Sequence, residues 1–470
     1  MGPIYNIATK GSNVYISSLC AIQRSPITTL KLPGQDMHLL HPLDSASIKS
    51  FTSIRHLSLM SVFHVAIGPA MGLVPASQKF LTDPDAGIFK RELSKLFNNE
   101  LRSLQNLRKY ASQLDLVVES HWQERAMGQK PDAKLRLGAW LFDLLSYSMG
   151  SVFWGQAGPF EDEGFRTQLR LFIQHLEELR NPITWLIPKD YTLARDSVRK
   201  AIGQAVRDEA YGKEQTTLFG HLATLYGSLD IPQEAFTDCH LVAIVGLMSN
   251  VINMITWALC NIIADSKLMA DIYKEIEAIA TPSSSSPDLK IDADQIRSSS
   301  PLLVATWYEL LRTYGDAPVA RGVYEDSLFA DKYRVQKGSF IMTPIHLHNF
   351  ERTIWGDDAD EFRPRRFLRA GSDVDKDLVK HLNVFGLPGM HQCPGRYLAM
   401  NMTLGILAKT LLTFVIKPAA GDELEKGVVP KQKDTMLGLP AMARDPEVVV
   451  GLRKQVKSVR VIYDNVRPGI

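Results

Sequence analysis

Apolar residues recur every three or four positions over most of the middle of the chain. The stretches 89–110 (FKRELSKLFNNELRSLQNLRKY) and 169–186 (LRLFIQHLEELRNPITWL) show this spacing most plainly. Such a spacing is typical of amphipathic helices with one buried face. We therefore predict helices over residues 85–280, interrupted near Pro182 and Pro188, and again over 293–314.

Short strand-like segments flank this helical body. Residues 2–33 alternate weakly around Tyr15 and Ile16 and are punctuated by Pro and Gly. Strand patterns return after Pro318 in VARGVYED and YRVQKGSFIM, and in the tail at 446–452 and 457–463. With no internal repeat, this order predicts a single domain that is mainly α-helical with a small β portion.

The most apolar stretch covers residues 241–263 (LVAIVGLMSNVINMITWALCNII), which contain no charge. It is long enough to cross a bilayer. Polar side chains at Ser249, Asn250 and Thr256 interrupt it, which favours a buried central helix. A membrane span remains open as the alternative.

Composition narrows the classes of protein. The chain has 470 residues, 45% of them hydrophobic and 22% charged, and a formal net charge of +2. A net charge this small gives no overall attraction to nucleic acid, so we expect no nucleic-acid partner. The cysteines, Cys20, Cys239, Cys260 and Cys393, form no CxxC pair, which excludes a disulfide framework and a Cys-rich zinc module.

One cysteine has distinctive surroundings. Cys393 lies in the segment FGLPGMHQCPGR (385–396), which is rich in Gly and Pro and runs directly into an apolar, helix-compatible stretch. The free N–H groups and the dipole at a helix N-terminus stabilise a thiolate. Such a thiolate suits a metal such as haem iron. The alternative is a buried structural cysteine in a turn.

This segment resembles the haem-binding loop of the cytochrome P450 family. Gly389, Cys393 and Gly395 match the family pattern, which implies that Cys393 is the axial ligand of the haem iron. His391 stands where the family usually has Arg, and the resemblance implies that it bonds a haem propionate. Phe385 lies one position further from Cys393 than the pattern expects, which indicates an extra residue in the turn.

Two further motifs agree with the resemblance. The sequence Glu309-Leu-Leu-Arg312 resembles the ExxR motif of the family, and the following FRPRRF resembles its PxRF segment. The resemblance implies a buried network of Glu309, Arg312 and Arg366 that braces the haem loop, with Arg365 as a competing candidate. The Glu-x-x-Arg pattern also occurs at 177–180, where an ordinary ion pair between residues three apart is expected.

The segment Pro318-Val-Ala-Arg321 resembles the family strand whose arginine reaches a haem propionate. The alternative for Arg321 is a surface residue on a strand. The family often has a second propionate partner, an Arg four residues after a Trp, and no Trp of this chain has one.

The stretch SNVINMITW resembles the helix over the haem in the branch that contains prostacyclin synthase and bile-acid sterol hydroxylases. Aligned on Trp257, it places Asn250 at the alcohol position and Ser249 at the acid position of the pair that relays protons to dioxygen. A second register would align Gly246 with the motif glycine and Ser249 with the alcohol. A third possibility is that Asn250 only bonds backbone.

The resemblance implies a cytochrome P450 monooxygenase with haem b as cofactor. It would take electrons from NADPH through NADPH–cytochrome P450 reductase and insert oxygen into a lipophilic small molecule. The segments that would line its cavity are mostly apolar; they are 69–75, 246–253, 315–319 and 437–440. The motifs resemble fungal enzymes of secondary metabolism, so we expect a terpenoid, alkaloid or polyketide. The alternatives are an isomerase or dehydratase that rearranges a peroxide without dioxygen or reductase, and a haem-binding sensor.

We expect residues 1–470 to form one catalytic domain and the protein to be a monomer. Eukaryotic relatives begin with a membrane helix, whereas this chain begins near the first strand. We therefore expect that an N-terminal anchor is missing, and that the native enzyme sits on the cytosolic face of the endoplasmic reticulum membrane. A naturally soluble form is the alternative.

Overall fold

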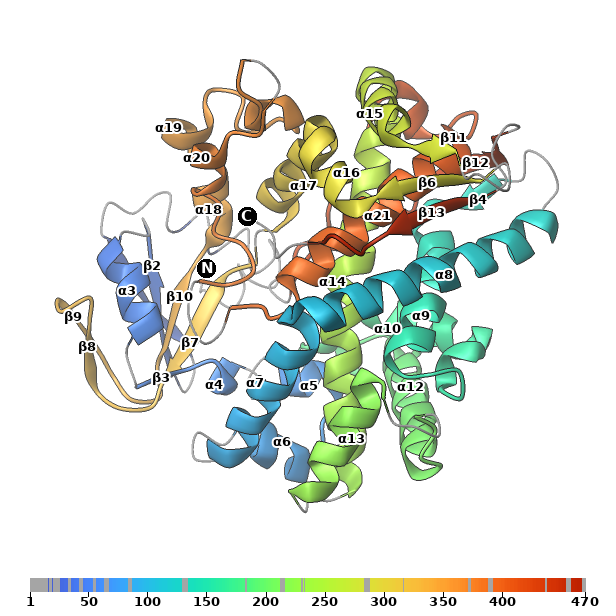
Figure 1. Cartoon of the computed structure of the whole chain (residues 1–470). Coiled ribbons are helices and arrows are strands. Elements are labelled where there is room, and N and C mark those ends of the chain that lie inside the picture. Colours follow the sequence, from blue (N-terminus) through green and yellow to red (C-terminus); the bar gives the residue numbers. More distant parts are fainter. Residues whose placement is uncertain are drawn as a thin grey trace.

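The structure is a computed structural model of the whole chain (Figure 1). It describes residues 16, 19, 26–32, 35–41, 45–53, 56–62, 67–82, 87–128, 134–181, 184–211, 216–229, 231, 233–282, 288–315, 317–370, 373–387, 392–435, 438–453 and 458–466.

Helices make up most of the described chain. Those before the central helix are α3 Ser45–Ser53, α4 Met60–Val62, α5 Gly68–Met71, α6 Pro75–Thr82, α7 Gly87–Arg102, α8 Leu104–Gly128, α9 Leu137–Phe153, α10 Glu163–Gln174, α11 Leu176–Leu179, α12 Lys189–Arg207 and α13 Leu218–Ser228. The central helix and those after it are α14 Gln233–Ala264, α15 Ser266–Ile279, α16 Ala293–Ser299, α17 Pro301–Tyr314, α18 Ile345–Asn349, α19 Arg352–Trp355, α20 Lys376–Val379 and α21 Arg396–Thr413. Short 3-10 turns are η2 Pro159–Glu161, η3 Thr184–Leu186, η4 Pro364–Phe367 and η5 Glu423–Lys426.

The central helix α14 contains the uncharged stretch and runs through the middle of the body (Figure 1). It packs against α6, α9, α12, α17 and α21. Among the described residues it is the one helix that is long and apolar enough to cross a membrane. Its apolar character is explained in this structure by neighbours on several sides, as expected for a core helix.

Local signals in the sequence set the helix ends near this core. The side chain of Asp265 accepts hydrogen bonds from the N–H groups of Lys267 and Leu268, which caps α15 and separates it from α14. Pro301 follows Ser300 and begins α17, so the helix predicted over 293–314 is divided into α16 and α17.

The β strands lie at two sides of the helical body, the largest sheet at the left of Figure 1 and the three-stranded sheets at its upper right. The largest sheet has the order β1-β2-β10-β7-β3, and its strands are β1 Ile27–Leu32, β2 Gln35–Leu40, β10 Phe340–Thr343, β7 Val319–Val323 and β3 Leu57–Ser58. β10 is parallel to β2 and antiparallel to β7, and Ile341 lies opposite Arg321.

Smaller sheets have the orders β11-β12-β4, β13-β6-β5 and β8-β9. Their strands are β4 Lys134–Arg136, β5 Thr281–Pro282, β6 Leu289–Asp292, β8 Ser327–Phe329, β9 Tyr333–Val335, β11 Phe414–Pro418, β12 Glu447–Leu452 and β13 Val459–Ile462. The mainly α-helical fold with a small β portion is therefore confirmed, as are the strands predicted after Pro318 and in the tail.

The strand expected around Tyr15 and Ile16 is wrong at Ile16. Ile16 and Leu19 have helical conformation, and their three-residue spacing places both against a small cluster with Leu30 and Met342. Tyr15 and most of residues 2–25 lie outside the described residues.

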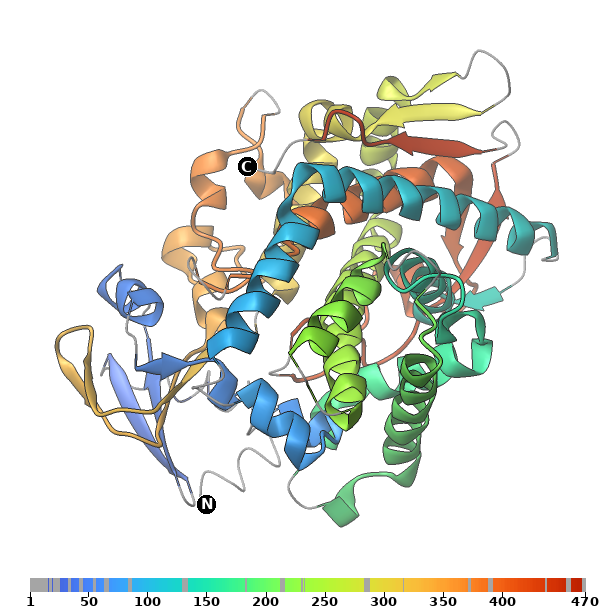
Figure 2. The ribbon, with the colours of Figure 1, turned by 60° about the horizontal axis from the view of Figure 1, so that its bottom comes forward.

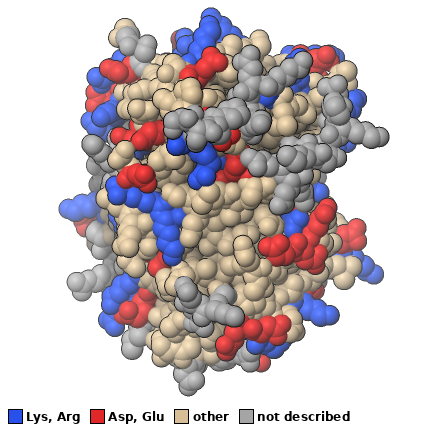
Figure 3. Space-filling view, turned by 45° about the vertical axis from the view of Figure 1, so that its right-hand side comes forward, with Lys and Arg blue, Asp and Glu red and all other residues tan. Residues whose placement is uncertain are grey.

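The main hydrophobic core is one continuous cluster built around α14, α17 and α21. Two smaller clusters flank the large sheet. In Figure 2, α8 crosses the body close to α21, and the two helices are in contact. On the face shown in Figure 3, Lys and Arg side chains are interspersed with Asp and Glu, which agrees with the small net charge.

Candidate functional site

A large cavity lies between α14 and the loop that precedes α21. Its volume is about 1330 Å³, and its lining is mostly apolar. Cys393 and Gly395 lie on its wall beside α21, and Gly246 and Asn250 lie on its α14 wall. No atom would approach within 4 Å of a Cβ placed on Gly246, so this part of the helix faces open space. The cavity can therefore hold a large, flat group between the sulfur and α14.

Cys393 is placed by the start of α21. Gly395 is the N-cap residue of this helix, and the backbone N–H groups of Gly395 and Arg396 act on the thiol. Burial raises the pKa of the Cys393 thiol, and these N–H groups together with the charge of Arg396 oppose that rise. A Cβ on Gly395 would lie 3.9 Å from the sulfur, an ordinary van der Waals contact, so Gly395 is a direct neighbour of the sulfur.

The loop before Cys393 begins with two residues in the left-handed backbone conformation. The backbone N–H of Cys393 donates to the carbonyl of Phe385 over 2.8 Å, which closes the loop. Phe385 has φ +61° and Gly386 has φ +78°. A left-handed conformation is costly for a bulky side chain, so the turn is accommodated at Phe385. Its ring lines the cavity and stacks at 6.2 Å from Trp307.

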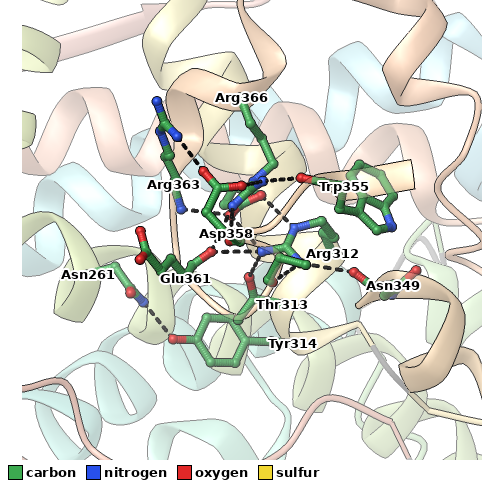
Figure 4. A network of polar contacts seen from close by, with 12 residues as sticks. Asn261, Arg312, Thr313, Tyr314, Asn349, Trp355, Asp358, Glu361, Arg363 and Arg366 are labelled. Atoms are coloured by element: carbon green, nitrogen blue, oxygen red, sulfur yellow. Dashed lines mark hydrogen bonds and ion pairs between the residues drawn. The ribbon is translucent and has the colours of Figure 1, made fainter. Parts of the chain in front are cut away.

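A buried charged network joins α17 to residues 349–366 (Figure 4). Glu309 and Arg312 are fully buried, and Arg312 donates two hydrogen bonds of 2.8 Å to the two carboxylate oxygens of Glu309. Arg366, on η4, donates to Glu309 over 3.0 Å. Each guanidinium also donates to backbone carbonyls, those of Asn349, Ala359 and Glu361 for Arg312 and those of Trp355, Asp358 and Glu361 for Arg366. The network thus ties α17 to the segment between β10 and the Cys393 loop.

The structure distinguishes the two arginines of the FRPRRF segment. Arg366 points into the network, whereas the neighbouring Arg365 pairs with Asp271 on α15 at 2.6 Å and is half-exposed. The second Glu-x-x-Arg copy, Glu177 with Arg180, forms an ion pair that remains partly exposed.

Asn250 and Ser249 both line the cavity, but their polar groups have partners in the protein. The side-chain oxygen of Asn250 accepts a hydrogen bond from the backbone N–H of Leu439 over 2.9 Å. The hydroxyl of Ser249 donates to the carbonyl of Val245, one turn earlier on the same helix, over 2.7 Å. The pair is therefore next to the cavity and already hydrogen-bonded.

Arg321 lies in the middle of β7 and is buried, with 5% of its surface exposed. It lies on the same strand face as Val319 and Val323, which pack in the same small cluster as Leu387 of the Cys393 loop. Its Nε has no hydrogen-bond partner among the described residues, and burial lowers the pKa of the guanidinium to about 10. A buried cation without a counter-charge indicates that an anionic group belongs beside it.

Two predicted site residues, Gly389 and His391, lie outside the described residues. Two cations that the sequence reasoning missed do line the cavity: Arg91 and Lys95, one turn apart on α7. Each pairs with Glu92 and remains largely exposed. The signal that could have found them is the pair of cations four residues apart on an amphipathic helix that precedes the core.

These observations together fit a haem. The part of the chain that the structure describes contains no cluster of three or more His, Cys, Asp or Glu side chains that could hold a metal ion by themselves. A single thiol in an apolar cavity is the donor set expected when a porphyrin supplies the other ligands. Arg91 and Lys95 on the cavity wall, and the buried Arg321 on β7, whose Val319 lines the cavity, would provide positive charge for its carboxylates.

Comparisons with known proteins agree with this geometry. Residues 226–448 match the sequence model of the family described as Cytochrome P450. Three relatives illustrate the similarity. Cytochrome P450 monooxygenase nodJ of Hypoxylon pulicicidum is 28% identical over 46% of this chain and 43% of its own. A cytochrome P450 monooxygenase of Gibberella zeae is 27% identical over 37% of this chain and 34% of its own. The 25-hydroxycholesterol 7-alpha-hydroxylase of Rattus norvegicus is 28% identical over 37% of this chain and 44% of its own.

The matched region spans less than half the length of each of these relatives. The matches confirm the family resemblance that the motifs indicate, and two of the three relatives are fungal.

Proposed function

Since residues 226–448 match the sequence model of the cytochrome P450 family, we propose that this protein is a haem-thiolate monooxygenase acting on a lipophilic small molecule. The observation that carries the proposal is the position of Cys393, which lies at the start of α21 in the wall of a large, mostly apolar cavity. When bound there, haem b supplies the chemistry that activates dioxygen.

The chain's own residues hold and orient the cofactor in this proposal. Cys393 would bind the haem iron, and the N–H groups of Gly395 and Arg396 would stabilise its thiolate. Arg321 neutralises a haem carboxylate, as do Arg91 and Lys95 at the rim. The network of Glu309, Arg312 and Arg366 fixes the backbone behind the loop, so that the sulfur stays at a constant position.

The cavity also indicates the class of substrate. Phe97, Phe153, Leu176 and Met254 are among the apolar side chains that line it. Burying apolar substrate surface here is favourable by about 25 cal/mol per Å², so a lipophilic molecule is expected. We further propose a fungal natural product, electrons from NADPH through a P450 reductase, and a location at the endoplasmic reticulum membrane; these proposals rest on the resemblance and on the relatives' names.

One observation favours a second candidate, the rearrangement of a peroxide substrate. In the described part of α14, the cavity-lining hydroxyl of Ser249 is bonded to Val245 and the Asn250 oxygen to Leu439. Proton delivery through these groups would require a local rearrangement or an ordered water. An isomerase or dehydratase needs no such delivery.

The carbon-monoxide difference spectrum of the reduced protein tests haem-thiolate ligation. We expect the band characteristic of thiolate ligation in the native protein and its loss in Cys393→Ala. A Cys393→Ala variant that keeps both haem and this band would overturn the assignment. Product formation that requires NADPH, reductase and dioxygen supports the monooxygenase, whereas full anaerobic turnover of a peroxide without reductase supports the second candidate.

A further inference from the structure

Three side chains of α14 form hydrogen bonds with the backbone of the loop at Gly438–Pro440. Asn250 accepts the N–H of Leu439 over 2.9 Å, and Asn253 donates its side-chain N–H to the carbonyl of the same residue over 3.1 Å. The indole N–H of Trp257 donates to the carbonyl of Pro440 over 2.8 Å. Both backbone polar groups of Leu439 are thus bound by amides from a helix nearly two hundred residues away in sequence.

The spacing along α14 explains how one helix does this. Residues 250, 253 and 257 follow each other at intervals of three and four, so they share one helix face. That face contacts the part of the loop that forms the cavity wall. Gly438 and Leu439 both line the cavity.

The loop can approach this closely only because residue 438 is glycine. Gly438 has φ +129°, and a Cβ at this position would lie 2.6 Å from the side-chain oxygen of Asn250. A real Cβ essentially never comes this close to another heavy atom, and this φ is unfavourable for any other residue. The hydrogen bond between the loop and the Asn250 amide therefore requires a residue without a Cβ at position 438.

We propose that Asn250 and Asn253 are positioning residues that fix the Gly438–Pro440 loop and thereby determine which molecules fit above the haem. The inference rests on the proposed haem function. In this inference the Asn250 oxygen serves to bind the loop. The loop is one wall of the cavity, and the bond keeps this wall at a constant distance from α14.

The two amides differ in a way that makes the inference testable. Asn250 uses its oxygen, which an aspartate retains as an acceptor, so Asn250→Asp should keep the loop in place. Asn253 uses its N–H, which an aspartate lacks, and a carboxylate would then face the carbonyl of Leu439. Asn253→Asp should therefore release the loop, as should Asn250→Ala. If the two residues only stabilised the fold, or if Asn250 only transferred protons, Asn250→Asp and Asn253→Asp would not be expected to differ in their effect on the loop.

The experiment measures the Soret shift on titration of the haem-loaded protein with imidazole and with 4-phenylimidazole. Both azoles bind haem iron, but only the larger one reaches the cavity wall. The ratio of their dissociation constants should change by about three- to tenfold in Asn250→Ala and Asn253→Asp, the range expected for losing one hydrogen bond. It should stay at the native value in Asn250→Asp.

Asn261→Ala is the matched control. Asn261 lies on the same helix and donates to the carbonyl of Trp257 and to Tyr314, but it neither contacts the loop nor lines the cavity. It should lower the unfolding temperature without changing the azole ratio. Equal ratios in Asn253→Asp and Asn261→Ala, or equal changes in Asn250→Asp and Asn250→Ala, would overturn the inference. A native protein in which neither azole shifts the Soret band would overturn the haem assignment itself, and the inference with it.

Discussion

Glu309 and Arg312 are both fully buried and form a two-point ion pair within one turn of α17. Arg366 and the backbone N–H of Arg363 complete the coordination of the same carboxylate. Glu309→Ala would leave the buried Arg312 without its counter-charge and Arg366 with Asp358 alone. We expect a loss of stability of about 3–5 kcal/mol, seen as haem-free or insoluble protein and measured by chemical unfolding together with haem content.

The chain offers a matched control for this substitution. Glu177→Ala removes the acid of the other Glu-x-x-Arg pair, which is partly exposed. The side chains of this pair keep 19% and 24% exposure, so water partly screens the charge that remains, and this variant should keep its haem and lose less stability than Glu309→Ala. Similar losses in both variants would mean that burial of the Glu309 network has no special role.

Removing the charge of Arg321 should have opposite effects on the stability of the haem-free protein and on the retention of haem. Its buried guanidinium has an Nε without a partner among the described residues, and a haem carboxylate would supply one. Arg321→Met should leave the stability of the haem-free protein unchanged or raise it, because an uncompensated charge is removed. It should also speed haem release about tenfold or more, as expected for a lost charged hydrogen bond.

Transfer of haem to apomyoglobin measures that rate. Arg334→Met is the control, because Arg334 is exposed on β9 and pairs loosely with Asp326 at 3.7 Å. Equal rates of haem transfer from the two variants would exclude Arg321 as a partner of the haem.

Ser249 provides a further prediction about the helix over the cavity. Its hydroxyl donates a hydrogen bond to the carbonyl of Val245 on its own helix. This bond is local to the helix, so the hydroxyl is not directed at a molecule in the cavity. Ser249→Ala should change turnover by about twofold or less, equivalent to about 0.5 kcal/mol. A large increase in hydrogen peroxide released per NADPH consumed would instead show that the hydroxyl takes part in proton delivery.

Much of the fold follows from local pattern, and the reason is visible in particular residues. The helical spacing around α10 and α17 and the Gly/Pro loop at Cys393 depend on neighbours within a few positions. A periodic pattern records such neighbours directly. The motifs also reduced the candidates for the charged network to Glu309, Arg312 and Arg366, with Arg365 as the one alternative.

What the pattern could not supply are contacts between distant segments. The motif match favoured Arg366 but could not exclude Arg365, because the choice between them depends on where Asp271 lies on α15. It could not show that Asn250 meets Leu439, since nothing local to either residue records the other. Ile16 was read as part of a strand because two residues are too few to separate alternation from a three-residue repeat.

The last prediction concerns acid stability and depends on His240. This side chain is completely buried in α14, where its Nδ1–H donates to the carbonyl of Phe236 over 2.8 Å and its Nε2 accepts from the hydroxyl of Tyr211 at 3.1 Å. Trp154 and Phe219 surround the ring with ring-centre distances of 5.3 and 5.6 Å. Burial lowers the pKa of His240 to about 4, so the folded protein keeps the ring neutral.

The unfolded chain binds a proton at this histidine below about pH 6.5, whereas the folded protein resists it until about pH 4. Stability should therefore fall as the pH drops through this window, by about 3 kcal/mol in total from this one group. His240→Gln retains a donor and an acceptor but cannot titrate, so its stability should depend less on pH between 6.5 and 4. Urea unfolding of both proteins at several pH values in this window measures the difference. Parallel pH profiles would mean that His240 is protonated in the folded state or contributes nothing to acid unfolding.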